Sequence, residues 1–284
     1  QDQGNSNYGT AIVGTVSGTA ISFGSPVVFD GNASVQPLKA TFDTTAKKIV
    51  IAYREGNVGR AIIGTVSGTT ISFGSRVTFE SGNATHISIV YDSTNNKIVI
   101  ACRDNGNSAY GTAVVGTVSG TTISFGTSVV FESASTSYIS AVFDSSSNKV
   151  VLAYKDSGNS GHGTAIVGTV SGTSISFGSP VVFESAASDF ISATYDSSAN
   201  RVVIAYVDSG NSSYGTAVVG TVSGTSISFG TPVVFENAYS PYISATYDSN
   251  ANKVVIAYPD NGNSEYGTVI VGTVSGTSIS FGSP

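Results

Sequence analysis

Alternating apolar and polar residues organise this chain into hairpins. The stretch from Tyr214 to Phe235 holds two such runs, interrupted at the dipeptide Ser223-Gly224. Alternation with a period of two is typical of half-buried strands, and a Gly-containing dipeptide between two runs predicts a tight hairpin turn with positive φ at Gly224. Pro232 lies in the second run and predicts an edge strand or a bulge there. Close copies of the stretch begin at Tyr8, Val58, Tyr110, His162 and Tyr266, and the turn glycine recurs as Gly18, Gly68, Gly120, Gly172 and Gly276.

A second pair of strands is expected between successive hairpins. It is clearest at residues 243–248 and 253–258, which are joined by a short polar turn. The second of these runs is apolar on both faces, so it belongs in the interior. Each repeat then supplies four strands, which we call A (243–248), B (253–258), C (215–223) and D (226–235). The phenylalanine of strand D recurs every 50 or 52 residues, at Phe23, Phe73, Phe125, Phe177, Phe229 and Phe281.

A repeat of this size with four antiparallel strands predicts an all-β β-propeller, a single domain over residues 1–284. A linear β-solenoid is the competing architecture. Complete A to D repeats begin at Leu38, Ile87, Ile139, Ile191 and Ile243, which indicates five blades in a ring closed by strands from both termini. The hairpin at residues 8–29 is then one too many. We expect residues 19–29 to complete the outer edge of the last blade, although the hairpin at 266–284 could close the ring instead, or the spare hairpin could pair with another copy.

The candidate binding residues lie where the repeats differ from one another. The C to D turns are nearly identical copies, whereas the D to A connections and the residues around the B to C turns vary, so we expect variable loops on one face. Aromatic rings beside hydroxyl, amide and cationic groups are suited to holding sugars by stacking and hydrogen bonding. The alternative is that the rings only fill the gaps between blades. The predicted glycan-binding residues are His86, Tyr138, Phe190, Tyr242, Arg103 and Lys155.

The same repetition disfavours metal sites and catalytic sites. Four of the B to C turns carry one aspartate, such as Asp156, and each A to B turn carries another, such as Asp144. Turn capping is expected of both, in preference to a calcium loop at the B to C turns, and no metal or cofactor is expected. The carboxylates recur identically, whereas catalysis needs a differently tuned pair, so we expect no enzyme. Cys102 replaces a tyrosine of strand B, and a buried, inert thiol is expected there.

The composition limits the kinds of partner that the chain could bind. Charged residues make up 11% of the chain and the formal net charge is −6, which argues against nucleic acid and anionic membrane surfaces. No apolar run approaches the roughly 20 residues of a membrane span, so no membrane insertion is expected. The surface must be formed by Ser, Thr, Asn and Gly, as is common in secreted and particle-surface proteins. Because Met and a signal peptide are absent, we expect a processed product or an excerpt of a longer chain.

The sequence of the repeat resembles a known kind of repeat array. The pattern ISATYDSSANRVVIAYVDSGNSSYGTAVVGTVSGTSISFGTPVVF, residues 191–235, is similar to repeat arrays in tail-fibre and adhesin-like proteins of marine phages and bacteria. The resemblance implies a propeller displayed on a virion or cell surface for attachment. The hypothesis is therefore a non-enzymatic, extracellular or particle-surface module that binds glycans or a cell-surface receptor through its variable face. The alternative is a structural spacer or assembly module that contacts neighbouring repeats or copies of itself.

Overall fold

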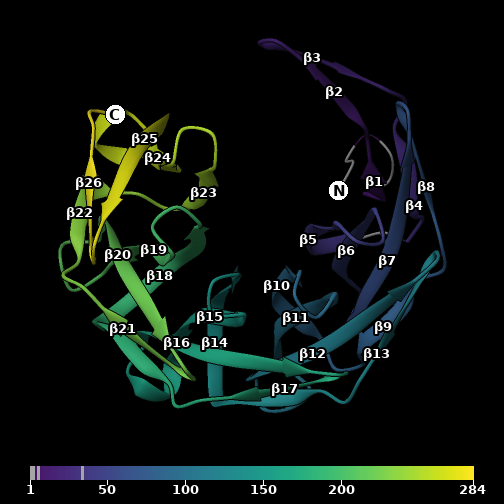
Figure 1. The fold of residues 1–284 in the computed structure, drawn as a ribbon, viewed down its shortest axis with the longest axis horizontal. Coiled ribbons are helices and arrows are strands. Elements are labelled where there is room, and N and C mark those ends of the chain that lie inside the picture. Colours follow the sequence, from purple (N-terminus) through teal and green to yellow (C-terminus); the bar gives the residue numbers. More distant parts are fainter. Residues whose placement is uncertain (1–3, 5–6, 33–34) are drawn as a thin grey trace. The chain divides into compact units, whose positions relative to one another are not determined.

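The computed structural model describes residue 4 and residues 7–32 and 35–284, and these residues are mainly β-strand (Figure 1). The all-β prediction is confirmed. Short 3-10 helices occur at Ser157–Asn159 (η2) and Asn261–Asn263 (η3). In this part of the chain no helix is long and apolar enough to cross a membrane. The chain forms two compact units, one of residues 1–129 with 172–174 and one of residues 130–171 with 175–284.

The first unit contains the leading hairpin and two repeats. The strands of the leading hairpin are β1 (Gly9–Ala11), β2 (Gly14–Ser17), β3 (Ala20–Phe23) and β4 (Val27–Asp30). The first repeat follows with β5 (Val35–Asp43), β6 (Lys48–Glu55), β7 (Val58–Ser67), β8 (Thr70–Phe73) and β9 (Val77–Glu80), and the second with β10 (Ala84–Asp92), β11 (Lys97–Asp104), β12 (Tyr110–Ser119) and β13 (Thr122–Phe125). The antiparallel order β5-β6-β7-β8 is the predicted order A to D.

The second unit continues the same pattern. Its strands are β14 (Val129–Asp144), β15 (Lys149–Asp156), β16 (His162–Ser171), β17 (Ser174–Phe177), β18 (Val181–Asp196), β19 (Arg201–Asp208), β20 (Tyr214–Ser223), β21 (Ser226–Phe229), β22 (Val233–Tyr239), β23 (Ser244–Asp248), β24 (Lys253–Asp260), β25 (Tyr266–Ser275) and β26 (Ser278–Phe281). Strands A, B, C and D of the last repeat are β23, β24, β25 and β26, in that order across the sheet.

The hairpin of strands C and D has the predicted turn. Ser223 pairs with Ser226, which leaves Gly224 and Thr225 as the two turn residues, and Gly224 has φ of 61°. Glycine with positive φ at the first turn position is the type II′ hairpin. The five copies of this glycine have φ between 56° and 62°, so the prediction is confirmed. Pro232 lies between β21 and β22, which pair with opposite ends of β20. Strand D of this repeat thus lies at the edge of its sheet, as expected.

The prediction of a loop between strands D and A is wrong for part of the chain. In the second unit β18 runs without a break from strand D of one repeat into strand A of the next. Its first half pairs with β16, as in Ala165 opposite Val181, and its second half pairs with β19, as in Ser192 opposite Ala205. The intervening Ser and Ala residues are small, and the register shifts in the pairing with β16 and again in the pairing with β19. Their backbone groups therefore find partners on successive sheets rather than in a loop.

The expectation for residues 19–29 is also wrong. Strand β3 pairs with β2, and β4 pairs with β1, so this segment pairs within the leading hairpin. The last repeat has its own fourth strand, because β26 pairs with β25 over Gly272 to Ser275. Local pairing across a tight turn closes only a short loop, whereas the expected pairing joins segments more than 200 residues apart and costs more chain entropy.

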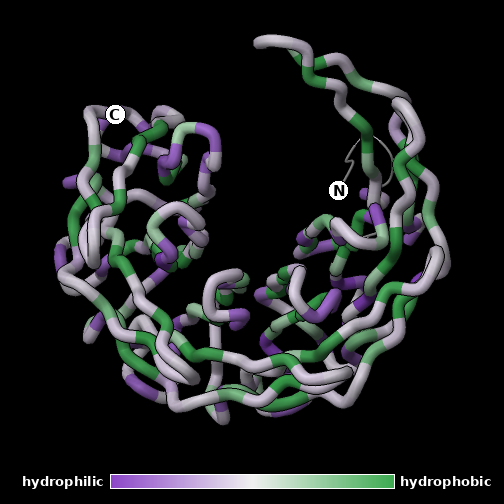
Figure 2. Tube along the Cα trace, in the orientation of Figure 1, coloured by the Kyte–Doolittle hydropathy of each residue, from purple (hydrophilic) through white to green (hydrophobic). Residues whose placement is uncertain are grey.

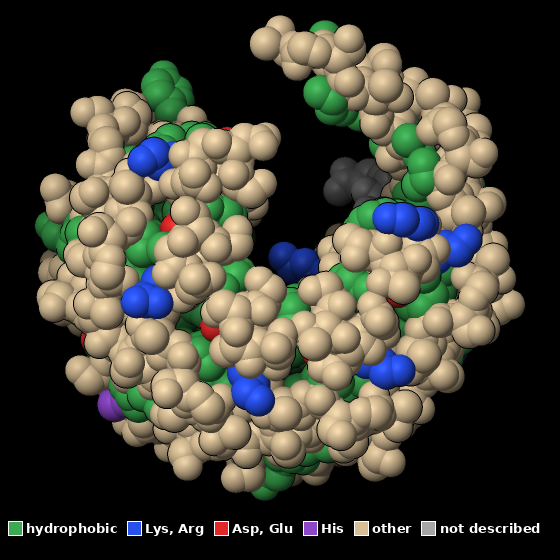
Figure 3. Space-filling view, in the orientation of Figure 1, with side chains coloured by type: hydrophobic (Ala, Val, Ile, Leu, Met, Phe, Trp, Pro, Cys, Tyr) green, Lys and Arg blue, Asp and Glu red, His purple; other side chains and the backbone are tan. Residues whose placement is uncertain are grey.

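The hydrophobic core lies between successive repeats. Val202, Ile204 and Tyr206 of β19 face a cluster shared with the preceding repeat. The alternate residues Val203 and Ala205 face a cluster shared with the following repeat. Green apolar positions recur along the strands in Figure 2, whereas the face drawn in Figure 3 is mostly uncharged, with its Lys and Arg side chains lying singly. Burial of both faces of strand B is confirmed.

Glycines let the backbones of adjacent repeats touch. A Cβ atom at Gly178 would lie 1.9 Å from the carbonyl oxygen of Thr225, and one at Gly230 would lie 1.9 Å from that of Thr277. These threonines belong to the C to D turn of the following repeat. The close approach explains why both the Ser-Phe-Gly segment and the Ser-Gly-Thr turn recur nearly unchanged: any side chain at the glycine would push the repeats apart.

Candidate functional site

The predicted rings occupy a strained backbone position. His86, Tyr138, Phe190 and Tyr242 have positive φ values of 48°, 50°, 51° and 54°. At the first three of these positions the register between strands A and B shifts, as between Ser137 and Ser140, which is the mark of a β-bulge. A non-glycine residue in this conformation costs on the order of 1–3 kcal/mol, and such residues cluster at functional sites. The chain uses glycine at its hairpin turns, yet it keeps large rings here.

In the second unit three of these rings lie against one another. Tyr138 and Phe190 have ring centroids 5.1 Å apart, and Phe190 and Tyr242 have centroids 5.0 Å apart. Tyr239 joins them, with its centroid 6.4 Å from that of Phe190. We call Tyr138, Phe190, Tyr239 and Tyr242 the ring cluster. The cluster brings together aromatic side chains from three successive repeats.

The ring cluster is both packed and exposed. Tyr138 and Phe190 are half-buried and pack against the cores between repeats, so each of them also fills a gap as the alternative reading supposed. Tyr242 is 74% exposed, and Tyr239 is exposed as well. The inner rings are thereby held rigid by packing, and the outer rings present aromatic faces to solvent. A rigid aromatic surface of this kind suits stacking against an apolar ring face.

An ion pair borders the ring cluster. Lys155 Nζ lies 2.6 Å from Asp189 Oδ1, and both side chains are half-buried. Lys155 stands opposite Ser137 in the sheet, next to Tyr138, and Asp189 precedes Phe190. Lys155 is the cation that the sequence predicts here, whereas Asp189 and Tyr239 were not predicted. Both lie in the variable D to A segments, with Asp189 directly before Phe190 and Tyr239 three residues before Tyr242, and this position is the signal that could have identified them.

His86 and Arg103 lie together in the first unit. Burial, and then the nearby charge of Arg103, lower the pKa of His86 below its usual value. The imidazole is therefore neutral at pH 7. Arg103 is opposite Thr85 in the sheet, and its Nε atom is buried with no hydrogen-bond partner among the residues that the structure describes. This pair offers a neutral ring and a guanidinium at the strand position that corresponds to Tyr138 and Lys155.

The turn aspartates cap their own turns. Asp156 Oδ1 accepts hydrogen bonds from the backbone N–H groups of Gly158 at 2.8 Å and Asn159 at 3.2 Å, and Asp144 Oδ1 accepts from Ser146 N at 2.9 Å. The capping prediction is confirmed. Over residues 7–32 and 35–284, no three His, Cys, Asp or Glu side chains gather as a metal site would require.

Buried tyrosines of strand B hold the glutamates that end strand D. Tyr206 Oη donates to Glu184 Oε2 at 3.0 Å, and Tyr154 Oη donates to Glu132 Oε2 at 3.1 Å. Burial raises the pKa of Glu132 and of both tyrosines. Each of these pairs satisfies polar groups that are buried where two successive repeats meet. Cys102 stands at the same strand position and is buried, as predicted, and burial raises the pKa of its thiol.

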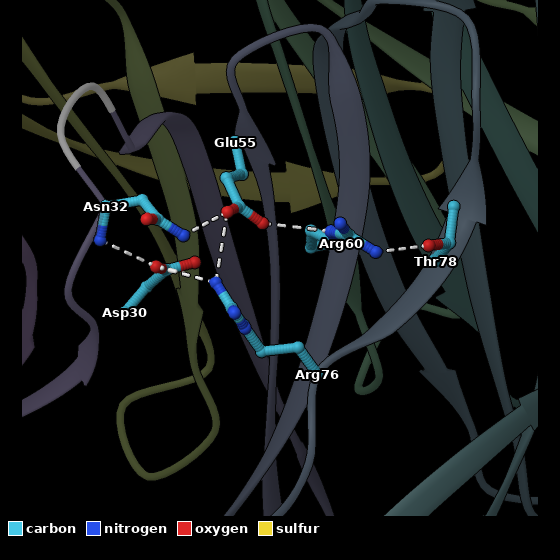
Figure 4. A network of polar contacts seen from close by, with 6 residues as sticks. All are labelled: Asp30, Asn32, Glu55, Arg60, Arg76 and Thr78. Carbon is cyan, nitrogen blue, oxygen red and sulfur yellow. Dashed lines mark hydrogen bonds and ion pairs between the residues drawn. The ribbon is translucent and has the colours of Figure 1, made fainter.

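A polar network in the first unit departs from the repeat (Figure 4). Arg76 Nη1 contacts Asp30 Oδ1 at 2.9 Å and Glu55 Oε1 at 3.0 Å. Arg60 Nε donates to Glu55 Oε2 at 2.9 Å, and Asn32 also donates to Glu55. Asp30 is fully buried and belongs to the leading hairpin, whereas Arg76 belongs to the first repeat. The network therefore joins the leading hairpin to the repeat that follows it.

Comparison with solved structures finds proteins of similar fold. The lectin BP39L from Burkholderia pseudomallei is similar with a TM-score of 0.70 and 10% identity, over 90% of this chain and 72% of that one. AofleA from Arthrobotrys oligospora is similar with a TM-score of 0.55 and 12% identity, over 99% of this chain and 88% of that one. A variant of AofleA with three arginines changed to alanine gives a TM-score of 0.59, with 12% identity and the same coverage. No family model matches this sequence, and neither does any curated protein.

Proposed function

We propose that the chain is a non-enzymatic carbohydrate-binding module, and that the ring cluster is its binding surface. The observation that carries the proposal is the positive φ of Tyr138, Phe190 and Tyr242. Glycine would relax the backbone at each position, so keeping a large ring there at an energetic cost favours a need for the ring itself. Packing alone does not require Tyr242, which is mostly exposed.

The chemistry around the rings suits a sugar. Aromatic faces stack on the apolar C–H face of a pyranose, and the Lys155 to Asp189 pair offers a charged donor and acceptor beside them for sugar hydroxyls. His86 and Arg103 provide a related arrangement in the first unit. BP39L, which is similar in fold, is a lectin, and this supports the same class of ligand for the present chain.

The arrangement of the repeats as blades is also part of the proposal. Four antiparallel strands repeated at 50 or 52 residues, with a core between successive repeats, suit blades of a β-propeller, and five such blades remain our proposal. The low charge and the Ser, Thr, Asn and Gly surface support an extracellular or particle-surface location, such as a tail fibre or an adhesin. On such a particle the ligand would be a glycan of a cell-surface receptor.

The test is a glycan-array screen of the folded wild-type chain, followed by affinity measurements on any hit. Tyr138→Gly and Tyr242→Gly remove the rings and relax the backbone, so we expect both variants to stay folded and to lose at least tenfold in affinity. Tyr266→Ala removes an exposed tyrosine of β25 outside the ring cluster and serves as the matched control. A folded wild type with no hit on a broad array, or unchanged binding by both glycine variants, would refute the proposal.

A further inference from the structure

The arginines of the chain are concentrated in the first unit. Four of the five lie in its two repeats, as Arg54, Arg60, Arg76 and Arg103. Arg60 pairs with the carboxylate of Glu55, and Arg76 pairs with that of Asp30. In the part of the chain that the structure describes, Arg54 and Arg103 form no ion pair. Two guanidinium groups of an otherwise acidic chain are therefore not paired with a carboxylate of the protein.

The second unit shows what binds a cation at this position of the repeat. Arg54 stands at the position of strand B that Lys155 has two repeats later. Lys155 Nζ lies 2.6 Å from Asp189 Oδ1, and Asp189 belongs to strand A of the next repeat. In the repeat after Arg54 the corresponding residue is Thr85, which carries no charge. The carboxylate that neutralises Lys155 thus has no counterpart beside Arg54.

Arg54 is held in place with some of its hydrogen-bond donors unused. Its Nε donates to the backbone oxygen of Gln36 at 2.8 Å, and its Nη1 donates to Asn83 Oδ1 at 3.1 Å. A guanidinium has five N–H donors in one plane, and those of Nη2 make no hydrogen bond with the described residues. The side chain is half-buried. A guanidinium that is fixed in this way can donate to a planar carboxylate at little cost in entropy.

The segment that this guanidinium contacts carries further groups suited to a sugar. Asn83 accepts through Oδ1, which leaves its amide N–H groups to donate. Asn105 Nδ2 donates to the backbone oxygen of Asn83 at 2.8 Å and to Thr85 Oγ1 at 3.0 Å, which fixes the segment. His86 offers a ring, and burial, followed by the charge of Arg103, lowers its pKa below the usual value. The segment therefore combines a neutral ring, an amide and a hydroxyl with a second positive charge nearby.

We propose that Arg54 and residues 83–86 form a second carbohydrate site, which binds an acidic sugar through its carboxylate. The carboxylate takes the place beside Arg54 that the Asp189 side chain takes beside Lys155, and the sugar ring lies against His86. Sialic acids and hexuronic acids both carry the required group. The inference rests on the proposed function only in that the ligand is a carbohydrate, because the ring cluster lies in the second unit and takes no part in this site.

The test compares matched acidic and neutral sugars by isothermal titration calorimetry. Methyl glucuronide differs from methyl glucoside only in that a carboxylate replaces a hydroxymethyl group, and sialyllactose differs from lactose by its sialic acid. At least one acidic sugar should bind wild type about tenfold more tightly than its neutral counterpart, and added salt should weaken its binding. The two pairs distinguish a hexuronic acid from a sialic acid. Equal affinity within both pairs would overturn the proposal.

The imidazole of His86 reports where the acidic sugar binds. The chain has two histidines, and the other, His162, lies in β16 of the second unit. Binding should shift the NMR signals of His86 and raise its pKa, because a nearby anion favours the charged imidazole. The signals of His162 should stay where they are. If saturation with the sugar leaves the signals of His86 unchanged, the ligand lies elsewhere and the proposal is wrong.

Variants at the site and outside it complete the test. Arg54→Gln removes the charge and should lower the affinity for the acidic sugar about tenfold. Thr85→Asp supplies a carboxylate as Asp189 does to Lys155, so it should block the site. Arg201→Gln changes the remaining arginine, which lies in the second unit, and should bind like wild type. Circular dichroism checks each fold, and full affinity in both folded site variants would contradict the proposal.

The ring cluster is tested separately. Tyr242→Gly should leave acidic-sugar binding at Arg54 unchanged. Glycan binding that depends on Tyr242 and shows no preference for a carboxylate would refute the acidic-sugar site alone. Acidic-sugar binding that shifts His86 and survives both Tyr138→Gly and Tyr242→Gly, with no other glycan bound, would refute the ring cluster alone.

Discussion

The rings of Tyr138 and Phe190, one repeat apart in sequence, lie with their centroids 5.1 Å apart, and each sits on a residue with left-handed backbone conformation. The strained backbone turns each side chain out of the regular alternation of strand A. In a strand without a bulge, the period of two would place each ring on the same face of its sheet as the residues two positions away. The bulge thus aligns aromatic side chains from successive repeats into one cluster.

Replacing Tyr242 by glycine should weaken glycan binding and leave the fold at least as stable. Glycine relieves the positive φ, which is worth about 1 kcal/mol, and the exposed ring loses little packing. The melting temperature, followed by circular dichroism, should stay constant or rise. Tyr242→Ala is the matched variant, because alanine removes the ring and keeps the strain. A lower melting temperature for Tyr242→Gly than for Tyr242→Ala would contradict the strain argument.

Gly230→Ala should destabilise the chain by about 1–3 kcal/mol, because the new Cβ would lie 1.9 Å from the Thr277 carbonyl oxygen and force two repeats apart. Urea unfolding gives the free energy. The chain supplies its own control at Gly282, the same position of the last repeat, where the nearest atom to a Cβ is 3.9 Å away. Gly282→Ala should change stability by no more than about 0.5 kcal/mol. Equal effects of the two substitutions would show that inter-repeat contact is not the cause.

Arg76→Ala should loosen the leading hairpin. Removing the guanidinium leaves the buried carboxylate of Asp30 without its charged partner, at a cost of about 1–2 kcal/mol after allowing for the exposure of Arg76. Hydrogen exchange should speed up in β1 and β4 more than in the later repeats. The double variant Asp30→Asn with Arg76→Ala removes the unpaired charge and should recover part of the protection. Unchanged exchange in β4 would mean that the network does not hold the hairpin.

Glu132→Gln should make stability less dependent on pH. Burial raises the pKa of Glu132 in the folded state, so the folded chain holds this proton more tightly than the unfolded chain does. The resulting stabilisation is fully present below the unfolded pKa of about 4.3 and is lost as the pH rises through the higher folded value. The difference in melting temperature between variant and wild type should therefore favour the variant more at pH 7 than at pH 4. A larger advantage at pH 4 would reverse the sign of the argument.

The thiol of Cys102 should be unreactive in the folded chain. It is buried, and burial raises its pKa, so both access and thiolate are lacking at pH 8. Ellman's reagent should label less than a tenth of the chains before unfolding and nearly all of them in 6 M guanidinium. Fast labelling under native conditions would show that the repeat containing Cys102 opens locally.

The local features of the fold could be predicted from the sequence because each depends on neighbouring residues. A period of two indicates a strand, and Ser223-Gly224 between two strands indicates a hairpin whose glycine has positive φ. The apolar Val254, Val255 and Ile256 indicate a strand buried on both faces. Asp156 caps the turn that begins with it. In each of these cases the interaction spans a few residues, so the pattern and the structure contain the same information.

The candidate site was predicted in part for a related reason. Comparison of copies within the chain singled out Tyr138, Phe190 and Tyr242 as rings at one position of the repeat, and the structure places them side by side. It did not reveal Tyr239, which has no counterpart ring in the other copies, or Asp189, whose value lies in its contact with Lys155 from the preceding repeat. Contacts between residues of different repeats do not appear as a periodic pattern in the sequence.

The sequence by itself determined the repeat, its four strands, their order and their turns, because hydrophobic period and turn chemistry act within some ten residues. Only the tertiary structure decided that β18 passes from one sheet to the next, that the leading hairpin pairs with itself, and that the rings of strand A stand on left-handed bulges. These features depend on which strands compete for the same backbone hydrogen bonds and on the space left between repeats. That competition is settled by packing in three dimensions, where residues a full repeat apart become neighbours.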